Sequence, residues 1–129
     1  MIKPIYLCGP IQGRTWVESH QWRDYATTLL APAQPVRNPL TRGYDEHNWQ
    51  EIVEGDIADI AECRALLVMY DKPSVGTAME IRLAKAEYGI PVHVVDISGA
   101  PRSPWLIYHA ERFYDTLEEA CAVLREDVG

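Results

Sequence analysis

The sequence predicts an α/β fold in which helices cover both faces of a doubly wound, mainly parallel sheet of five strands. Short apolar segments of strand length alternate along the chain with longer segments of helical spacing. The strand candidates are apolar throughout, as expected for a parallel sheet that is buried on both faces. The chain of 129 residues suits one domain, which we expect to span residues 1–129.

The first two strand candidates flank one long helix. Residues 2–8 form the first strand, and a glycine-bearing turn follows over residues 9–14. Residues 15–30 are predicted to be helical, Pro32 ends this helix, and residues 34–37 form a short second strand. The apolar residues of the helix recur roughly at helical spacing: Trp16, Trp22, Tyr25, Ala26 and Leu29.

The second half of the fold follows the same alternation. Residues 41–46 are polar and are expected to form a loop. Asp45 or Asn48 can cap a helix that runs to about Cys63, and residues 65–70 are the third strand. The remaining elements are expected in this order: a helix over residues 75–88 that Gly89 ends, a strand over 91–95, a loop over 97–103, a helical turn over 105–109, a strand over 112–114, and a helix over 116–125 that Thr116 caps.

The charge and the cysteine content exclude several classes of function. The net charge of −7 argues against bulk nucleic acid as a partner, because backbone binding needs a basic surface; a single nucleotide stays compatible. Cys8, Cys63 and Cys121 are an odd number without metal-binding spacing, and they are expected to be buried, reduced thiols. The four histidines show no metal-ligand spacing, so no metal is expected. Without a signal peptide or a membrane-spanning run, we expect a cytoplasmic protein with no membrane partner.

Glu80 lies in an early turn of the helix that follows the third strand, where open α/β sheets hold ligands. Its neighbours on the same helical stripe include no cation: Gly76, Thr77, Leu83 and Ala84. A carboxylate in these surroundings faces a pocket or the top of the sheet, or it merely favours the positive end of the helix dipole. We hypothesise that Glu80 is a nucleophile.

Asp56 interrupts an apolar stripe, four residues after Ile52 and four before Ile60. A buried carboxylate is costly unless it is paired or functional, whereas one at the margin of the buried face reaches water. Gly55 costs about 1 kcal/mol against alanine in a helix, which suggests the close approach of another group. Two carboxylates in different surroundings suit glycosidic chemistry, with one attacking the anomeric carbon and the other, kept protonated by burial, donating to the leaving group.

Three further features lie at the same predicted edge of the sheet. Tyr6 can orient Glu80 or be a core tyrosine with its hydroxyl at the rim. Ser74 is a good N-cap for the helix of Glu80. The turn of Gly9 and Arg14 can cradle a phosphate or a sugar, although it matches neither the dinucleotide-binding nor the Walker pattern.

Three segments now stand in a familiar order and spacing. They are Tyr6-Leu-Cys-Gly-Pro-Ile11, Asp56-Ile-x-x-Ile with the apolar strand after it, and Ser74-Val-Gly-Thr-Ala-Met-Glu80 with Ala84 and Gly89-Ile-Pro-Val92. Together they resemble the nucleoside 2-deoxyribosyltransferase family, and the resemblance runs from Ile2 to about Leu124.

The resemblance implies a flavodoxin-like sandwich, a nucleoside or nucleotide and a free nucleobase as ligands, no cofactor, and a homo-oligomer with shared active sites. It implies that Glu80 attacks C1′ and forms a covalent deoxyribosyl-enzyme, that Asp56 holds and protonates the base, and that Tyr6 positions the nucleophile. The loop after the fourth strand would reach a neighbour's pocket. The substrate-binding residues inferred in this way are Gly9, Ile11, Gln12, Arg14, Ser74, Gly76, Met79, Ser103, Trp105 and His109.

The sequence leaves the acceptor of the sugar open. Transferases of this family often have an aspartate where this chain has Ser74, and at that serine and at Cys8-Gly9 the chain resembles a branch of deoxynucleoside 5′-monophosphate N-glycosidases. Pro10, however, stands where that branch has a turn serine. We therefore expect deoxyribosyl transfer to a second base, with hydrolysis of 5′-monophosphates and non-catalytic nucleotide binding as the alternatives.

Overall fold

The computed structural model describes residues 1–43, 45 and 47–126, and its core is a five-stranded sheet with every strand parallel. The strand order is β2-β1-β3-β4-β5, which is the flavodoxin-like order of a doubly wound fold. This confirms the predicted fold class. The strands are β1 (Ile5–Cys8), β2 (Val36–Arg37), β3 (Ala65–Tyr70), β4 (Val92–Asp96) and β5 (Arg112–Tyr114).

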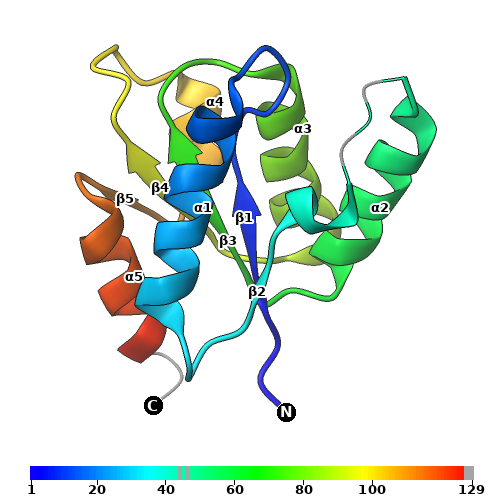
Figure 1. Cartoon of the computed structure of the whole chain (residues 1–129). Helices are drawn as coiled ribbons and strands as arrows, with labels where there is room; N and C mark the ends of the chain where they lie inside the picture. The colour runs from blue at the N-terminus through cyan, green and yellow to red at the C-terminus, as the bar shows by residue number, and fades with distance from the viewer. Residues whose placement is uncertain (44, 46, 127–129) are drawn as a thin grey trace.

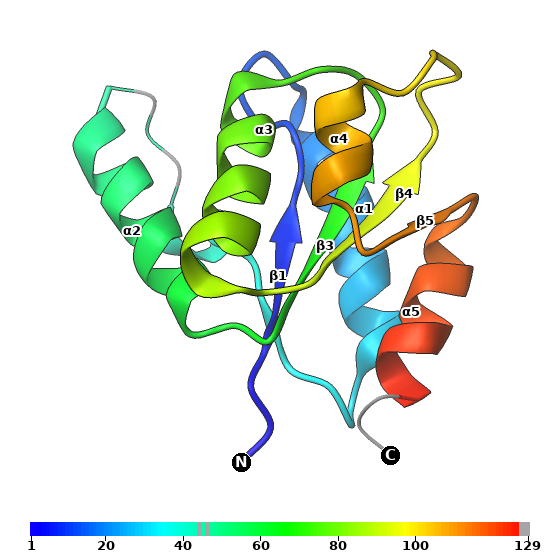
Figure 2. The same ribbon diagram turned by 180° about the vertical axis from the view of Figure 1, so that it is seen from behind.

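Helices cover both faces of this sheet (Figures 1 and 2). Helices α1 (Trp16–Leu30) and α5 (Leu117–Glu126) pack on one face. The other face carries α2 (Trp49–Ala61), α3 (Val75–Arg82) and α4 (Pro104–His109).

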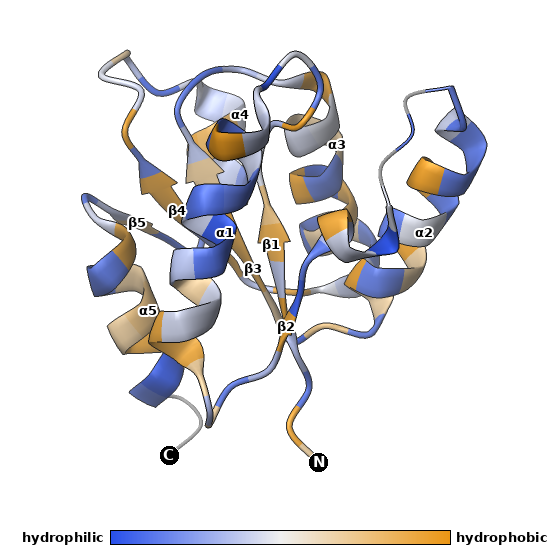
Figure 3. Cartoon of the chain, viewed as in Figure 1, coloured by the Kyte–Doolittle hydropathy of each residue, from blue (hydrophilic) through white to orange (hydrophobic). Residues whose placement is uncertain are grey.

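The alternation of side chains along β1 directs its residues to different faces of the sheet. Ile5 and Leu7 enter the core under α1 and α5, whereas Tyr6 and Cys8 enter the core on the side of α2, α3 and α4. Strands β1, β3 and β4 are mostly orange in the hydropathy view of Figure 3, and polar residues lie mostly on the outer helical surfaces. Tyr6 is thus a buried residue that shares a layer with the helix of Glu80.

Several element boundaries differ from the sequence expectation. Strand β1 begins at Ile5, not at residue 2, because its first ladder partners are Val36 in β2 and Ala65 in β3. A 3₁₀ helix, η1 (Pro39–Arg42), occupies part of the expected loop, and the Asn38 side chain caps it by accepting from the Leu40 amide at 3.0 Å. Tyr44 and Glu46 of that loop lie outside the described residues.

The helix predicted over residues 75–88 is interrupted by a π-helical turn, η2 (Leu83–Glu87). Gly89 follows with a φ of 63°, so it takes the left-handed conformation predicted for it, and the next amide, that of Ile90, bonds the Ala84 carbonyl at 2.9 Å. The caps Thr15, Ser74 and Thr116 also lie at the predicted helix starts.

Helix α1 forms where its apolar spacing predicted it, but not all of these apolar residues lie on its buried side. Trp16 and Tyr25 are exposed, and the helix instead buries Ser19 and Arg23 together with its apolar residues Ala26 and Leu30. The reason is that backbone carbonyl groups at the carboxyl end of β1 accept hydrogen bonds from a buried side chain of α1. Arg23 donates to the carbonyls of Leu7 (3.4 Å) and Gly9 (2.9 Å), where β1 runs into its turn.

Candidate active site

Glu80 points from α3 toward β1 and receives two hydrogen bonds there. The Tyr6 hydroxyl donates to Oε2 at 2.5 Å, and the Cys8 thiol donates to Oε1 at 3.6 Å. Both donors come from the same side of β1, two residues apart, so the strand holds both carboxylate oxygens. Ser74 fixes the start of α3, since its side chain accepts from the Thr77 amide at 3.5 Å.

Burial, together with the negative charge of Asp56, raises the pKa of Glu80 to about 7. The hydrogen bonds from Tyr6 and Cys8 and the positive charge of Arg23 oppose this shift without cancelling it. No salt bridge to Glu80 occurs within the described residues. The absence of a cation on its helical stripe, which the sequence indicated, therefore leaves the carboxylate without an ion-pair partner at neutral pH.

Asp56 has the opposite environment, because a cation contacts it directly. Arg42, at the end of η1, donates from Nη2 to Asp56 Oδ1 and from Nε to Asp59 Oδ2 at 3.0 Å. Asp59 also receives Arg37 at 3.2 Å. A side chain at Gly55 would collide with this arrangement, since a Cβ there would stand 1.9 Å from Arg42 Nη1. The close approach suggested by a glycine inside the helix is confirmed.

The two carboxylates share one electrostatic system. Burial raises the pKa of Asp56, while the Arg42 guanidinium and the Tyr6 phenol lower it. The charges of Asp56 and Glu80 both act on Tyr6, whose own pKa is raised mainly by burial. Because Arg42 favours the ionised form of Asp56 and only neutral donors touch Glu80, the free protein favours the proton on Glu80. The sequence instead predicts an ionised Glu80 and an Asp56 that burial keeps protonated.

A cavity of about 510 Å³ opens onto both carboxylates. It is lined by the turn after β1, the first two turns of α2 and the start of α3. Five of the predicted substrate-binding residues gather there: Gly9, Ile11, Gln12, Ser74 and Gly76. Trp49, Lys72 and Thr77 complete its polar and aromatic lining, and the Thr77 hydroxyl is buried with no hydrogen-bond partner in the described part of the chain.

Arg14 does not line this cavity. Its guanidinium bonds Asp71 at 2.6 Å and Glu18 at 3.2 Å, and its side chain is only 12% exposed. The contact to Asp71 joins the turn after β1 to the turn after β3. The described structure therefore gives Arg14 a role in holding together two turns that border the site.

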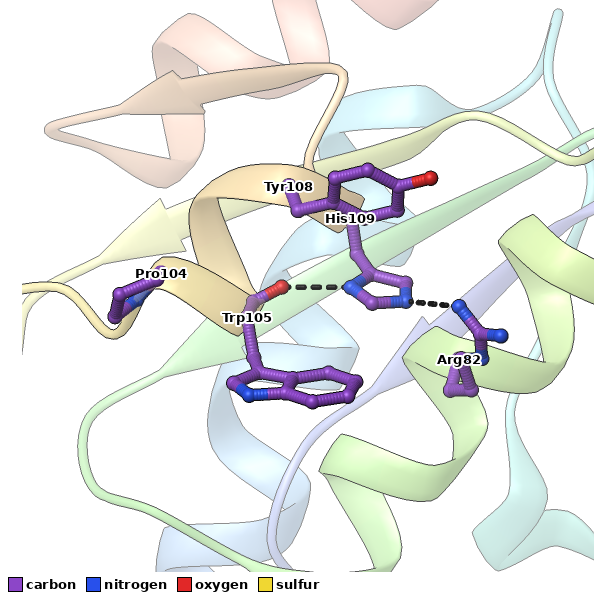
Figure 4. Close-up of a pocket in the computed structure, with 5 residues that line it drawn as sticks. All are labelled: Arg82, Pro104, Trp105, Tyr108 and His109. Atoms are coloured by element: carbon purple, nitrogen blue, oxygen red, sulfur yellow. Dashed lines mark hydrogen bonds between the residues drawn. The ribbon is translucent and has the colours of Figure 1, made fainter.

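The other predicted binding residues lie around α4, across α3 from the cavity. Met79, Ser103, Trp105 and His109 line a groove of about 550 Å³ with Arg82. Figure 4 shows the adjoining pocket, in which His109 stands between Trp105 and Arg82. Only Met79 of this group also lines a small pocket beside Glu80. Within one chain, α4 does not reach the carboxylates.

Two arginines of this region escaped the sequence reasoning. Arg42 was placed in a featureless polar loop, although the unexplained Gly55 and the acidic Asp56 and Asp59 signalled that something must pack there. Arg23 is fully buried. The only sequence signal for this burial is its spacing: Arg23 lies three residues before Ala26 and seven before Leu30, which are on the buried side of α1. That sign was hidden by the more numerous aromatic residues of α1.

Neither a metal site nor a membrane-spanning helix occurs among the described residues. No group of three or more His, Cys, Asp and Glu side chains is placed to hold a metal ion, and no helix has the length and apolar character needed to cross a membrane.

Comparisons with known proteins agree with this fold. A 2-deoxyribosyltransferase from Bacillus psychrosaccharolyticus superimposes with a TM-score of 0.74 at 14% identity, over 90% of this chain and 88% of that one. The CMP N-glycosidase of Clostridium botulinum gives a TM-score of 0.66 at 15% identity, over 95% and 98%. A search of curated proteins found no match. The sequence model described as nucleoside 2-deoxyribosyltransferase matches residues 5–101, which is most of the chain, and the protein therefore belongs to the nucleoside 2-deoxyribosyltransferase family.

Proposed function

We propose that this protein cleaves the N-glycosidic bond of a 2′-deoxynucleoside through a covalent glycosyl-Glu80 intermediate and passes the sugar to a second nucleobase. The observation that carries the proposal is the pair of carboxylates in one cavity, Glu80 held by Tyr6 and Cys8 and Asp56 held by Arg42. Family membership supports the class of reaction. One structural relative is named as a 2-deoxyribosyltransferase and the other as an N-glycosidase, and both reactions break an N-glycosidic bond.

The reaction proceeds in two displacements. Ionised Glu80 attacks C1′, the bond from C1′ to the base nitrogen breaks, and its electron pair leaves with the base. Asp56 stabilises the departing base by proton donation or by a hydrogen bond. A second base then gives its ring N–H proton to Asp56, attacks C1′ and displaces Glu80 as a carboxylate, so the anomeric configuration is retained overall.

The proton on Glu80 must leave before the first displacement. With a pKa of about 7, Glu80 is partly protonated in the free protein near neutral pH. The nucleophile needs the ionised form, so we expect kcat/KM to fall as the pH drops below about 7. The proton that Glu80 releases passes to Asp56 through the Tyr6 hydroxyl, which interacts with both carboxylates, so that Asp56 then holds the proton that it gives to the departing base.

The charges around the cavity favour a nucleoside as the substrate. Among the described residues that line it, Lys72 is the one cation and stands against Asp56 and Glu80. Arg14 is engaged by Asp71 and Glu18. A 5′-phosphate would thus bring two more negative charges to a site with little free positive charge.

One observation keeps hydrolysis of a 5′-monophosphate as the second candidate. Lys72, Ser74 and the unpartnered Thr77 hydroxyl lie together where α3 begins, and a helix N-terminus favours anions. A phosphate bound there would suit the N-glycosidase branch of the family. Non-catalytic binding on the same fold is the third outcome to be distinguished.

We also propose that the active protein is a homo-oligomer in which the α4 region of one subunit adds to the cavity of another. The proposal is supported by the exposure of Trp105 and by the separation of α4 from the carboxylates within one chain. Resemblance to a family with shared active sites points the same way.

Two measurements test the proposed reaction. A slow 2′-fluoro-arabino nucleoside should add one sugar mass to Glu80, detected by peptide mass spectrometry, and the adduct should be absent in Glu80→Gln. Unlabelled Glu80 together with full activity in Glu80→Ala would refute the mechanism.

Chromatography of a panel of nucleosides and 5′-monophosphates then separates the three functions. A new nucleoside in the presence of a second base indicates a transferase, and free base plus sugar indicates a hydrolase. An unchanged ligand that raises the melting temperature indicates a binding protein.

A further inference from the structure

We propose that Arg42 is a positioning residue of the reaction: it fixes the carboxylate of Asp56 at the cavity wall and controls when that carboxylate holds a proton. The inference rests on the proposed function, because it assigns Arg42 to the work of Asp56. It stands on three features of the structure, namely the contact itself, the glycine that makes room for it, and the way that η1 is anchored.

The contact joins Arg42 to two carboxylates of one helix. Nη2 meets Asp56 Oδ1, and Nε meets Asp59 Oδ2 at 3.0 Å. The side chains of Asp56 and Asp59 are only 20% and 17% exposed, so solvent screens these pairs less than it would at an open surface. The contact fixes one oxygen and the direction of the Asp56 side chain, which lines the cavity.

Gly55 makes this geometry possible. It lies beside Asp56 in α2, and a Cβ there would stand 1.9 Å from Arg42 Nη1 and 2.8 Å from Cζ. Any side chain would push the planar guanidinium away from the helix. Since glycine costs stability inside a helix, its presence at this contact is explained by the packing of Arg42.

The backbone that carries Arg42 is anchored next to β1. Helix η1 follows β2, whose Arg37 pairs in register with Tyr6. The Thr41 hydroxyl donates to the Asn38 carbonyl at 2.8 Å and stabilises the 3₁₀ turn. Arg42 is therefore delivered to α2 from a segment whose start is fixed beside the same strand that carries the Tyr6 hydroxyl.

The groups that act on Asp56 come from five elements. Arg42 reaches it from η1, Asp59 lies one turn further along α2, Tyr6 and Cys8 act from β1, Glu80 from α3 and Arg23 from α1. Arg42 and Arg23 are positive, and of these two only Arg42 contacts Asp56. Its removal leaves a buried carboxylate beside two others, so the proton affinity of Asp56 must rise.

The test compares Arg42→Gln with Arg37→Gln. Arg37 is a matched control, because it binds Asp59 and Glu62 but does not touch Asp56. Carbon-13 NMR titration of the Asp56 carboxyl group, assigned by its loss in Asp56→Asn, is performed in a Glu80→Gln background so that the titration belongs to one group. We expect Arg42→Gln to raise the pKa of Asp56 by about 1 unit or more and Arg37→Gln to leave it nearly unchanged.

Activity gives the second readout, measured with Glu80 intact. In Arg42→Gln, kcat/KM should fall about tenfold or more, and the pH limb that reports Asp56 should move to higher pH. Arg37→Gln should keep the wild-type profile. If the Asp56 titration and the pH profile coincide in the two variants, Arg42 has only a structural role and the proposal is overturned.

Two further variants cover a folding failure of Arg42→Gln. Gly55→Ala keeps the guanidinium but displaces it, so it should reproduce the higher pKa of Asp56. Arg42→Lys keeps the positive charge but loses the two-point contact. The pKa of Asp56 in this variant should therefore lie between the values in the wild type and in Arg42→Gln. A wild-type pKa in Gly55→Ala would contradict the proposal.

The NMR titration needs no turnover. It therefore separates a failure of this inference from a failure of the proposed reaction.

Discussion

Helix α3 separates the cavity of the two carboxylates from the groove beside α4, and the polar groups of the two differ in how they are paired. Val75, Gly76, Thr77 and Glu80 face the cavity with the carboxylates, whereas Ala78, Met79, Ile81 and Arg82 face the groove with α4. In the cavity, burial raises the pKa of both carboxyl groups, and Glu80 has only neutral donors. In the groove, the polar groups satisfy one another and the aromatic residues are exposed.

The His109 ring illustrates the satisfied state of the groove. Its Nδ1 lies 2.6 Å from the Trp105 carbonyl, which can only accept, so Nδ1 carries the proton. Nε2 is then free to accept from Arg82 Nη1 at 3.1 Å. A poised carboxylate indicates chemistry, whereas paired polar groups under exposed aromatic rings indicate a contact surface. The following experiments would break or sharpen this contrast, beginning with the largest effect.

Glu80→Gln should lower kcat/KM by at least about 10³-fold, because the amide cannot attack C1′. Steady-state kinetics with a deoxynucleoside and a second base measures the loss, and circular dichroism should show an unchanged fold. Retained turnover would show that the cavity side of α3 does not carry the nucleophile.

Asp56→Asn should lower kcat by about 10²-fold or more, because an amide cannot supply a proton to the leaving base. Substrates with activated leaving groups should lose much less, since they need little help in departing. Equal losses for good and poor leaving groups, or a protein that merely unfolds, would assign Asp56 a structural role.

Tyr6→Phe should lower kcat/KM by about tenfold at neutral pH and less at high pH. The Tyr6 hydrogen bond lowers the pKa of Glu80, so its removal raises that pKa and shrinks the ionised fraction. The acid limb of the pH profile should therefore move to higher pH. An unmoved limb would mean that the 2.5 Å contact does not govern the nucleophile.

The pH dependence of the protein's stability should also report the raised pKa of Glu80. The pKa of Glu80 is about 7 in the folded protein and about 4.3 in an unfolded chain. Between these pH values the folded state binds more protons, so the free energy of unfolding falls as the pH rises through this window. Urea titration at several pH values should show that Glu80→Gln flattens this fall and makes the protein more stable at pH 8 by up to about 3 kcal/mol.

Trp105→Ala should change the free energy of unfolding of one chain by less than about 1 kcal/mol, because the side chain is 71% exposed. Its effect should instead appear in size-exclusion chromatography as a smaller species at a given concentration. Trp16→Ala is the matched control, since Trp16 is equally exposed, at 68%, but lies on α1 over the other face of the sheet. The same elution for both variants would remove the groove as a subunit contact.

The sequence was sufficient for the order and type of most elements, because strand and helix periodicities are local properties of the chain. Strand β3, strand β5 and the caps Ser74 and Thr116 agree with the prediction. The π-helical turn after Arg82 and the start of β1 at Ile5 do not, since both depend on contacts that local patterns do not contain.

What the sequence determined by itself was that Glu80 and Asp56 are unusual and that Gly55 needs an explanation. What only the tertiary structure decided was how these residues meet. Arg42, from a segment that looks like a plain loop, pairs with Asp56, whereas the described side chains that donate to Glu80 are the neutral Tyr6 and Cys8. The physical reason is that the proton affinity of a buried carboxylate depends on the distance to charges brought from elsewhere in the chain, and such distances are set by packing.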